Sequence, residues 1–557
     1  MNIKETLDAL RAFVQEEYQA GFDQLADIWG KPLSNKLKTG ETQEIQSIKI
    51  ESSKYLLVAL GANESRFREG DMICLHYGDA ITEPFVRQAM IEAENDGEWL
   101  VRAEYDKSAI SSIKTPCYAD KDEMDLRAFF EKALDDIAKS PNGRNIVLPL
   151  LNGSLETDFV YEDYDEIADL AEAEGLNEHQ ADAVGKGVAA KYMACIQGPP
   201  GTGKTKVISL IAKLLVEEGQ SVLLTSHTHM AINNALNKII ENDVPTIKVG
   251  TASSNKGLKG SVQLFAHGDD WKERPDNGYV IGATPFATCS SRLENFEFDT
   301  VIFDEASQIT VPLAVMAMRK AKRFVFVGDH KQLPPVVVSK SILDKESYSV
   351  FSRLILNHKK VSVILKQTYR MNTSLSDWPS QQYYNGDLVS VGKNSHRLLD
   401  LERSPARYKT VLEKNNPFVF IKSPGTNART KNEKEALLIV DIIQTAIDTG
   451  MPPNSIGVVT PYRNHGKVIR SELTTALGLF TAKEIVTDTV ERMQGQEREM
   501  VIISLCSTDE QFIQAVANFF FQPERLNVAI TRPMTKLVLI GPELSKRGFN
   551  SLVQPLV

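Results

Sequence analysis

One short motif in the chain has the glycines and the lysine of a phosphate-binding loop. The sequence GPPGTGKT, from Gly198 to Thr205, matches the pattern G-x-x-x-x-G-K-[ST]. It follows the apolar run YMACIQ and precedes the helical pattern KVISLIAKLLVEEG, which is the context that the motif requires. Backbone N–H groups and the helix N-terminus would face phosphates, Lys204 would reach the β- and γ-phosphates, and Thr205 would bind Mg²⁺.

Two adjacent carboxylates end a second apolar run. In VIFDEASQ, Asp304 and Glu305 follow residues that are typical of a buried strand. Acidic residues are seldom buried unless they are paired or bind a metal. Taken alone, DEAS is more typical of a helix cap. Because a phosphate loop lies upstream, Asp304 is predicted to hold Mg²⁺, and Glu305 is predicted to orient and deprotonate the attacking water.

Alternating strands and helices are the elements that must position these motifs. From residue 176, helical segments separate the apolar runs YMACIQ, SVLLTS, YVIGAT, TVIFDE and RFVFVGD, and later PFVFIK, IGVVTP, IVTDTV, MVIISL and KLVLIG. Continuous apolar strands that alternate with helices indicate parallel sheets covered on both faces. The two series predict two α/β domains in tandem. The stretch from Ser390 to Asn416 has weak periodicity and is interpreted as a surface insertion.

The amino-terminal third has a different pattern. ETLDALRAFVQEEYQAGFDQLADIWG predicts one long amphipathic helix, short β-rich runs follow, and EMDLRAFFEKALDDIAK predicts a second helix. Residues 1–175 carry 18 Lys and Arg against 36 Asp and Glu, a balance of −18, whereas the remainder has a balance of +8. This asymmetry permits a nucleic-acid surface in the later part, although solvated surface charge explains it equally well.

Composition excludes several classes of protein. Hydrophobic residues make up 42% of the chain and charged residues 24%, which is ordinary for a soluble globular protein. No apolar run approaches the ~18 residues of a membrane span, and the start MNIKETLDAL lacks the apolar core of a signal peptide. The five cysteines are scattered and form no C-x-x-C, so zinc ribbons and iron–sulfur clusters find no support. We expect a reducing compartment, cytoplasmic or, in a eukaryote, nucleoplasmic.

Eight motifs, in order, closely resemble those of superfamily 1 helicases: LNEHQ, GPPGTGKT, DEASQ, GDHKQLPP, YRMN, VTPYRNH, TVERMQGQE and RLNVAITRP. Three of them, DEASQ, YRMN and QGQE, resemble the 5′→3′ branch, which includes the up-frameshift RNA helicase. The resemblance covers residues 176 to about 545 and weakly includes the first third. It implies an α/β protein with two tandem RecA-like parallel-sheet domains and an amino-terminal small β-barrel on stalk helices. The expected domains are a stalk helix (1–30), the small β-barrel (31–118), a second stalk helix with an acidic linker (119–175), and RecA-like domains at 176–345 and 346–557.

The resemblance also implies roles for single residues. Gln180 would read adenine, Gln332 would sense the γ-phosphate, Tyr369 would pack near the base, and Glu497 would contact the ribose. Arg370 and Arg532 would be arginine fingers from the second domain, a device worth about 10³–10⁵ in rate. The predicted catalytic residues are Lys204, Asp304, Glu305, Gln332, Arg370 and Arg532. The predicted nucleotide-binding residues are Gln180, Gly198, Pro199, Pro200, Gly201, Thr202, Gly203, Lys204, Thr205, Tyr369 and Glu497, with Thr205 and Asp304 as metal ligands. The predicted nucleic-acid contacts are Ser226, Asn233, Thr284, Thr460, Pro461, Tyr462 and Thr489.

The expected function is that of an ATP-dependent helicase or translocase that moves 5′→3′ on single-stranded nucleic acid, with ATP and Mg²⁺ as cofactors. DNA is slightly favoured over RNA as the partner. Two alternatives stay open. One is an RNA helicase, and the other is an ATP-gated clamp that remodels nucleoprotein complexes without processive unwinding.

Overall fold

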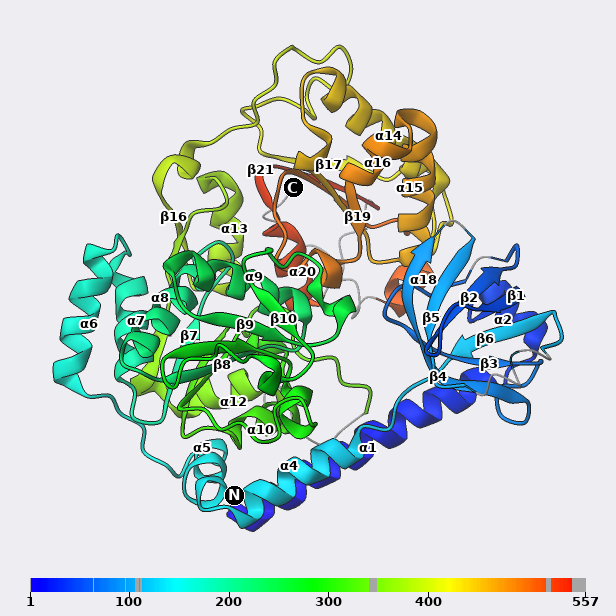
Figure 1. Cartoon of the computed structure of the whole chain (residues 1–557). Helices are drawn as coiled ribbons and strands as arrows, with labels where there is room; N and C mark the ends of the chain where they lie inside the picture. The colour runs from blue at the N-terminus through cyan, green and yellow to red at the C-terminus, as the bar shows by residue number, and fades with distance from the viewer. Residues whose placement is uncertain are drawn as a thin grey trace. The chain divides into compact units, whose positions relative to one another are not determined.

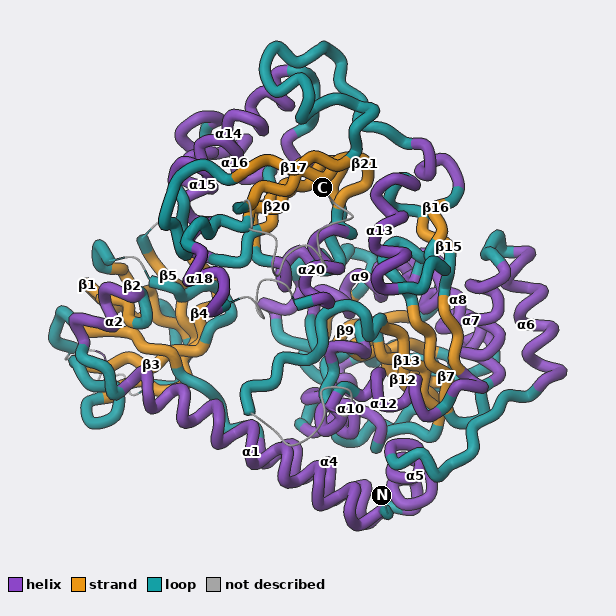
Figure 2. Tube along the Cα trace, turned by 180° about the vertical axis from the view of Figure 1, so that it is seen from behind, coloured by secondary structure: helices purple, strands orange, loops and turns teal. Residues whose placement is uncertain are grey.

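The structure is a computed structural model that describes residues 2–63, 65–95, 97–105, 110, 113–339, 348–516 and 522–542. The chain divides into two compact units, residues 1–140 with 336–344 and residues 141–335 with 345–557. Figures 1 and 2 show the elements of each unit from two sides. The boundary expected between residues 345 and 346 falls outside the described residues, as do residues 543–557.

Two helices of the first unit run side by side (Figure 1). The helix α1 (Ile3–Trp29) confirms the predicted amino-terminal helix, and α4 (Arg127–Lys139) confirms the second. Apolar residues of the first three turns of α1 are buried, and α4 buries a matching apolar stripe. An ion pair between Arg11 and Asp135 at 2.6 Å adds to this packing.

An antiparallel sheet follows the short helix α2 (Leu33–Thr39), as the β-rich runs predicted. Its strands are β1 (Thr42–Ile50), β2 (Tyr55–Leu60), β3 (Met72–His76), β4 (Pro84–Asn95), β5 (Glu98–Arg102) and β6 (Cys117–Lys121). Hydrogen-bonded neighbours follow the order β1-β2-β5-β4-β3-β6, and β6 also pairs with β1, so the order closes on itself. Apolar side chains such as Ile45, Ile73 and Trp99 fill the interior.

The first sheet of the second unit is parallel, as predicted. Its strands follow the order β10-β9-β11-β8-β12-β13-β7-β14. Their bounds are β7 (Met193–Gln197), β8 (Ser221–Thr225), β9 (Thr246–Val249), β10 (Gln263–Phe265), β11 (Tyr279–Gly282), β12 (Thr300–Phe303), β13 (Arg323–Gly328) and β14 (Ser362–Ile364). The helices around it are α5 (Leu148–Leu151), α6 (Tyr161–Ala173), α7 (Glu178–Ala189), α8 (Lys204–Glu217), α9 (His229–Ile239), α10 (Val311–Met318) and α12 (Val350–Asn357). Alternate strand residues share one apolar core with α7, α8 and α9, which explains the continuous apolar runs of the sequence.

The second sheet of this unit is also parallel, in the order β17-β21-β20-β18-β19. Its strands are β17 (Phe418–Lys422), β18 (Ile456–Val459), β19 (Val486–Asp488), β20 (Arg498–Ser504) and β21 (Pro533–Gly541). The remaining elements are β15 (Gln367–Thr368), α13 (Thr373–Tyr383), β16 (Val389–Ser390), α14 (Glu433–Asp448), α15 (Arg463–Leu477), α16 (Leu479–Glu484), α17 (Val490–Met493), α18 (Glu510–Ala515) and α20 (Pro523–Ile530). Two parallel sheets in tandem are the RecA-like cores that the motif order implied.

Most residues of the segment 390–416, which is interpreted as a surface insertion, are exposed, but a few of them are buried. Leu399, Val411 and Leu412 are buried in the apolar core beside the second sheet. The buried Lys536 ammonium on β21 donates hydrogen bonds to two backbone carbonyls near the end of this segment, Glu413 and Asn416. Burial lowers the pKa of Lys536 to about 8. The segment is therefore anchored to the core, by long-range contacts that its weak periodicity does not reveal.

All five cysteines lie in the described residues, and none of them forms a disulfide. Within the same residues, no helix combines the length and the apolar character that crossing a membrane requires.

Candidate active site

The phosphate loop connects β7 to α8, as the motif predicted. The Gly198 N–H donates to the Gly328 carbonyl at 2.9 Å, so the loop starts beside the carboxyl end of β13. The helix α8 begins at Lys204, whose ammonium donates back to the Gly198 carbonyl at 2.9 Å. The first N–H groups of a helix have no partner within it, so this end of α8 offers donors and positive potential to an anion.

Two glycines of the loop have backbone conformations that L-residues rarely adopt, with φ of +75° at Gly201 and +85° at Gly203. Space is short as well. A Cβ on Gly203 would lie 2.5 Å from the Gln180 amide nitrogen, and one on Gly201 would lie 2.5 Å from the Arg370 Cβ. The loop glycines are therefore needed both for the turn and for the close approach of two predicted site residues.

The predicted carboxylate pair follows β12. Asp304 is buried, and its Oδ1 accepts a hydrogen bond from the Glu305 N–H at 2.8 Å. Burial, and then the charge of Glu305, raise the pKa of Asp304, while the Lys204 ammonium opposes this rise. A buried carboxylate next to a second carboxylate fits a divalent cation, whose charge would stabilise the ionised form. Glu305 has φ of +51°, a strained conformation that turns its side chain at the strand end.

Two residues near Glu305 were missed in the sequence. The Gln494 amide donates to the Glu305 Oε2 at 3.2 Å. Its position inside the motif QGQE, which also contains Glu497, is the sequence signal that identifies it. His227 is the second residue. Burial lowers the pKa of His227, and the nearby charge of Glu305 opposes this.

The two predicted arginine fingers converge on Thr531. The Arg370 guanidinium donates to the Thr531 carbonyl at 3.1 Å and to the Glu497 carboxylate at 2.6 Å. Arg532 is buried and donates to the Val528 carbonyl at 2.8 Å and to the Thr531 hydroxyl at 3.2 Å. Burial, and then the charge of Arg370, lower the pKa of Arg532 to about 9. Glu497, predicted to contact a ribose, thus has Arg370 as its partner in this structure.

The residues predicted to surround the base lie beside the loop. The Gln180 amide donates to the Thr202 carbonyl at 2.9 Å, and its oxygen accepts from the Asn177 N–H in the capping box of α7. The Asn177 amide donates to the Tyr369 hydroxyl at 2.8 Å, and the Tyr369 N–H donates to the Gly201 carbonyl at 2.9 Å. Asn177 was not predicted as a site residue, although it stands in the recognised motif LNEHQ.

The predicted nucleic-acid residues lie where strands end. Ser226 follows β8, Thr284 follows β11, Thr460 follows β18, and Thr489 follows β19. The carboxyl ends of parallel strands meet at one edge of a sheet, so each sheet brings its own pair to the same edge. Pro461 and Tyr462 continue from β18 into α15.

Asn233 is placed differently from the other predicted contacts. It is fully buried in α9, and its amide donates to the Ser254 carbonyl at 3.0 Å and the Lys256 carbonyl at 2.9 Å. The buried Lys248 ammonium donates to its oxygen. These contacts hold the segment after β9, and the role of Asn233 in binding nucleic acid stays a prediction.

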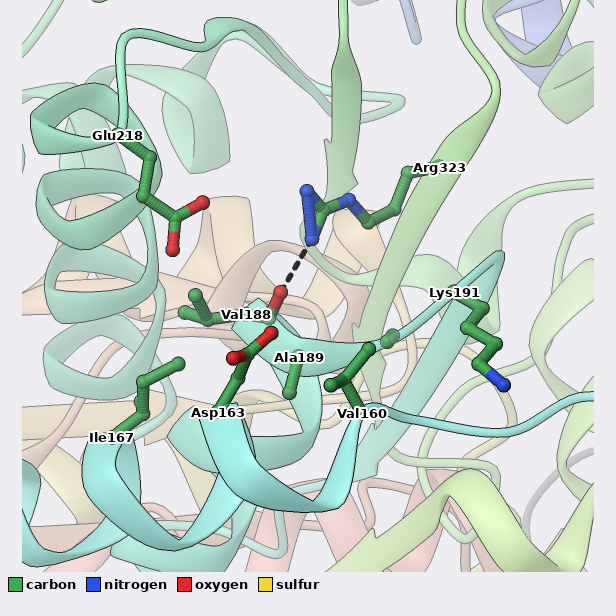
Figure 3. Close-up of a pocket in the computed structure, with 9 residues that line it drawn as sticks. Val160, Asp163, Ile167, Val188, Ala189, Lys191, Glu218 and Arg323 are labelled. Atoms are coloured by element: carbon green, nitrogen blue, oxygen red, sulfur yellow. Dashed lines mark hydrogen bonds between the residues drawn. The ribbon is translucent and has the colours of Figure 1, made fainter.

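A pocket elsewhere in the second unit has no part in this site. It lies where β13 begins, at Arg323, whereas the loop and the carboxylates lie where strands end. Figure 3 shows Asp163 and Glu218 on the side toward which the Arg323 guanidinium points, with its hydrogen bond to the Val188 carbonyl. Burial lowers the pKa of Arg323, and the charges of nearby carboxylates offset only part of this decrease.

Comparison with known families supports the motif order. Two family models, each described as an AAA domain, match residues 175–276 with 272–340, and residues 346–544. Together they span the two parallel-sheet cores.

Among curated relatives, the human DNA replication ATP-dependent helicase/nuclease DNA2 is 31% identical over 402 residues, which cover 66% of this chain and 37% of the relative. The corresponding protein of Schizosaccharomyces pombe is 29% identical over 408 residues, covering 69% of this chain and 29% of the relative. The chain thus spans about a third of the length of these relatives.

Solved structures with a similar course of the chain include the arterivirus nonstructural protein 10 helicase. The match to its crystal structure covers 94% of this chain and 82% of the arterivirus chain, at 13% identity and a TM-score of 0.40. The match to a complex of that protein with DNA covers 69% of this chain and 66% of the arterivirus chain, at 16% identity and a TM-score of 0.36. The eight motifs, the two matched AAA domains and the helicase/nuclease relatives show that this chain belongs to superfamily 1 helicases, in the up-frameshift-like group.

Proposed function

We propose that the chain is an ATP-dependent helicase or translocase that moves 5′→3′ along single-stranded nucleic acid. The observation that carries this proposal is the convergence of charges at the phosphate loop. Lys204 and the Asp304–Glu305 pair belong to the first parallel-sheet core, and the Arg370 side chain lies against Gly201 of the same loop. Arg532 and Glu497 belong to the second core. Arg370 donates hydrogen bonds to Glu497 and to the Thr531 carbonyl, and Arg532 donates to the Thr531 hydroxyl.

Each group has a chemical task in the proposed hydrolysis. Glu305 would accept the proton of the attacking water, and Lys204 with the α8 N-terminus would hold the phosphates. Thr205 and Asp304 would hold Mg²⁺, which offsets phosphate charge when it is bound. Arg370 and Arg532 would act on the charge that develops in the transition state, which is where added positive charge accelerates phosphoryl transfer.

The proposed motor consists of two RecA-like domains, expected at residues 176–345 and 346–557. Because β14 pairs with β7, the first of these domains also includes residues up to Ile364. Because the arginines and Glu305 belong to different cores, hydrolysis would depend on how these cores close, and closure could drive movement along a strand. Residues 1–30, 31–118 and 119–175 would be a stalk helix, a small β-barrel and a second stalk with a linker. The closed strand order of the antiparallel sheet supports the barrel.

The strand-end residues and the positive balance of the motor suit phosphate contacts without sequence preference. DNA as the substrate gains support from relatives whose names include DNA replication. The scattered cysteines of the sequence fit a cytoplasmic or nucleoplasmic location.

A strand-displacement assay on 5′- and 3′-tailed duplexes of DNA and of RNA tests the proposal, with Glu305→Gln as the inactive control. We expect ATP-dependent displacement of 5′-tailed DNA. Displacement of RNA alone would favour an RNA helicase. Hydrolysis stimulated by single strands without any displacement would favour an ATP-gated clamp, and hydrolysis that single strands do not stimulate would overturn the proposal.

A further inference from the structure

A buried carboxylate that is not in the predicted site lies at the centre of a hydrogen-bond network. Asp329 follows β13 and is fully buried. Its Oδ1 accepts from the Gln197 amide at 3.1 Å and the Lys331 N–H at 3.1 Å. Its Oδ2 accepts from the Gln332 amide at 2.8 Å and from the Tyr384 hydroxyl at 2.7 Å. The predicted γ-phosphate sensor, Gln332, therefore shares one carboxylate oxygen with a tyrosine.

Tyr384 extends the network to the helix that precedes Arg532. Tyr384 follows α13, and its side chain is buried. The Tyr384 hydroxyl donates a hydrogen bond to Asp329 and accepts one from the Asn527 amide at 2.8 Å. The same amide nitrogen donates to the Lys331 carbonyl at 2.8 Å. Asn527 lies within α20, and Arg532 follows that helix. The loop after β13 is therefore joined to the segment that carries the second arginine in two ways, directly through the Lys331 carbonyl and indirectly through Tyr384.

We propose that Tyr384 and Asn527 are positioning residues that couple the Gln332 loop to α20 and thus to Arg532. The inference rests on the proposed function and deepens it by naming how one site regulates the other. A buried carboxylate that loses a donor is costly, because its desolvation is then uncompensated. When Gln332 turns toward a phosphate, Tyr384 becomes the donor that keeps Oδ2 satisfied. The Tyr384 bond then tightens, and α20 is held in place through Asn527.

The alternative is that the network only stabilises the fold. Both readings predict that Tyr384→Phe, which keeps the ring and removes the hydroxyl, lowers thermal stability. They differ in kinetics. A structural role reduces basal and nucleic-acid-stimulated turnover in proportion to the loss of folded protein. A positioning role acts on the closed state, so it lowers kcat of the stimulated reaction and leaves KM for ATP nearly unchanged.

The neighbouring Tyr383 provides the matched control. Its ring packs edge-on against Trp378, and within the described residues its hydroxyl has no hydrogen bond. Tyr383→Phe therefore removes a hydroxyl from the same helix end without touching the network. A double variant of Tyr384→Phe with Gln332→Ala completes the design, because two residues that act through one carboxylate should not have additive effects.

The experiment measures basal turnover, stimulated turnover and KM for ATP on full-length protein, below the melting temperature of every variant. We expect Tyr384→Phe to lower stimulated kcat about 10-fold with KM within about twofold, and Tyr383→Phe to match the wild type. The effect of Tyr384→Phe should shrink when Gln332 is already alanine.

Three results would overturn the inference. Unchanged stimulation in Tyr384→Phe would do so, as would a proportional loss of basal and stimulated turnover, or full additivity with Gln332→Ala. Each of these leaves the proposed function intact. A wild-type chain that single strands do not stimulate would instead overturn the proposed function, and this inference with it.

Discussion

Replacing Glu497 with glutamine separates two roles for this residue. The family resemblance implies a ribose contact, whereas in the structure its carboxylate accepts from the Arg370 Nε at 2.6 Å. The Glu497 side chain is 50% exposed and that of Arg370 is 11% exposed. Solvent therefore weakens the pair to about 1 kcal/mol, below the 1.5–3 kcal/mol of a buried charged hydrogen bond. If Glu497 positions Arg370 for the transition state, kcat falls about fivefold while KM for ATP stays nearly constant.

Steady-state kinetics with ATP and with 2′-deoxy-ATP distinguish the two roles. A ribose contact predicts that the glutamine variant has a higher KM for ATP, close to its KM for 2′-deoxy-ATP, with kcat unchanged. That outcome would refute the argument from the ion pair. Glu499→Gln is the matched control, because Glu499 lies two residues further along and its partners Arg397 and Thr535 are not predicted site residues. We expect its kinetics to match those of the wild type.

Three further predictions concern hydrolysis, packing and pH. Glu305→Gln keeps the side-chain size but cannot accept a proton, so ATP turnover should fall at least about 100-fold while nucleotide binding persists; near-normal turnover would contradict the assignment. Gly201→Ala puts a Cβ 2.5 Å from that of Arg370 at φ of +75°, so the free energy of unfolding in urea should fall by about 2–4 kcal/mol. Gly219→Ala, with φ of +80° and its nearest neighbour at 3.7 Å, should cost less, and an equal loss would refute the steric argument. Burial lowers the pKa of His465 to about 4 from 6.5, so the unfolded chain binds more protons between these values and stability is lost as the pH falls through that window. His465→Gln should remove about 2 kcal/mol of the stability loss between pH 7 and pH 5, and an unchanged pH dependence would show that this imidazole does not titrate on unfolding.

Backbone features of the site were predictable because they depend on local sequence. The glycines of GPPGTGKT require a turn between a strand and a helix, and β7 and α8 flank it as expected. The Asp304–Glu305 pair follows a strand because apolar residues run directly into it. The strand-end positions of Ser226, Thr284, Thr460 and Thr489 follow from the same pattern. In each case the local sequence decides where the chain turns.

Side-chain partners were not predictable, because they come from distant parts of the chain. Tyr384 stands in QQYYNGD, which has no recognisable motif, and its partners Asp329 and Asn527 are 55 and 143 residues away. Arg370 and Glu497 are separated by 127 residues. The other four residues stand in recognisable motifs, but a motif does not show which residue of another motif its side chain contacts. Only the packing of two sheets against shared loops decides which donor meets which acceptor.

Four of the side chains predicted to meet a nucleotide share one property: each of the four has a partner inside the chain. Lys204 donates to the Gly198 carbonyl, Arg370 to Glu497, Arg532 to Val528, and Gln332 to Asp329. Binding a phosphate would therefore exchange hydrogen bonds rather than add them, and an exchange contributes less free energy than a new bond. The exchanges differ in what they release. Lys204 leaves a carbonyl within its own loop, whereas Gln332 leaves a buried carboxylate that Tyr384 must then satisfy. Through Gln332, phosphate binding would thus strengthen the Tyr384 contact that holds α20 of the second core.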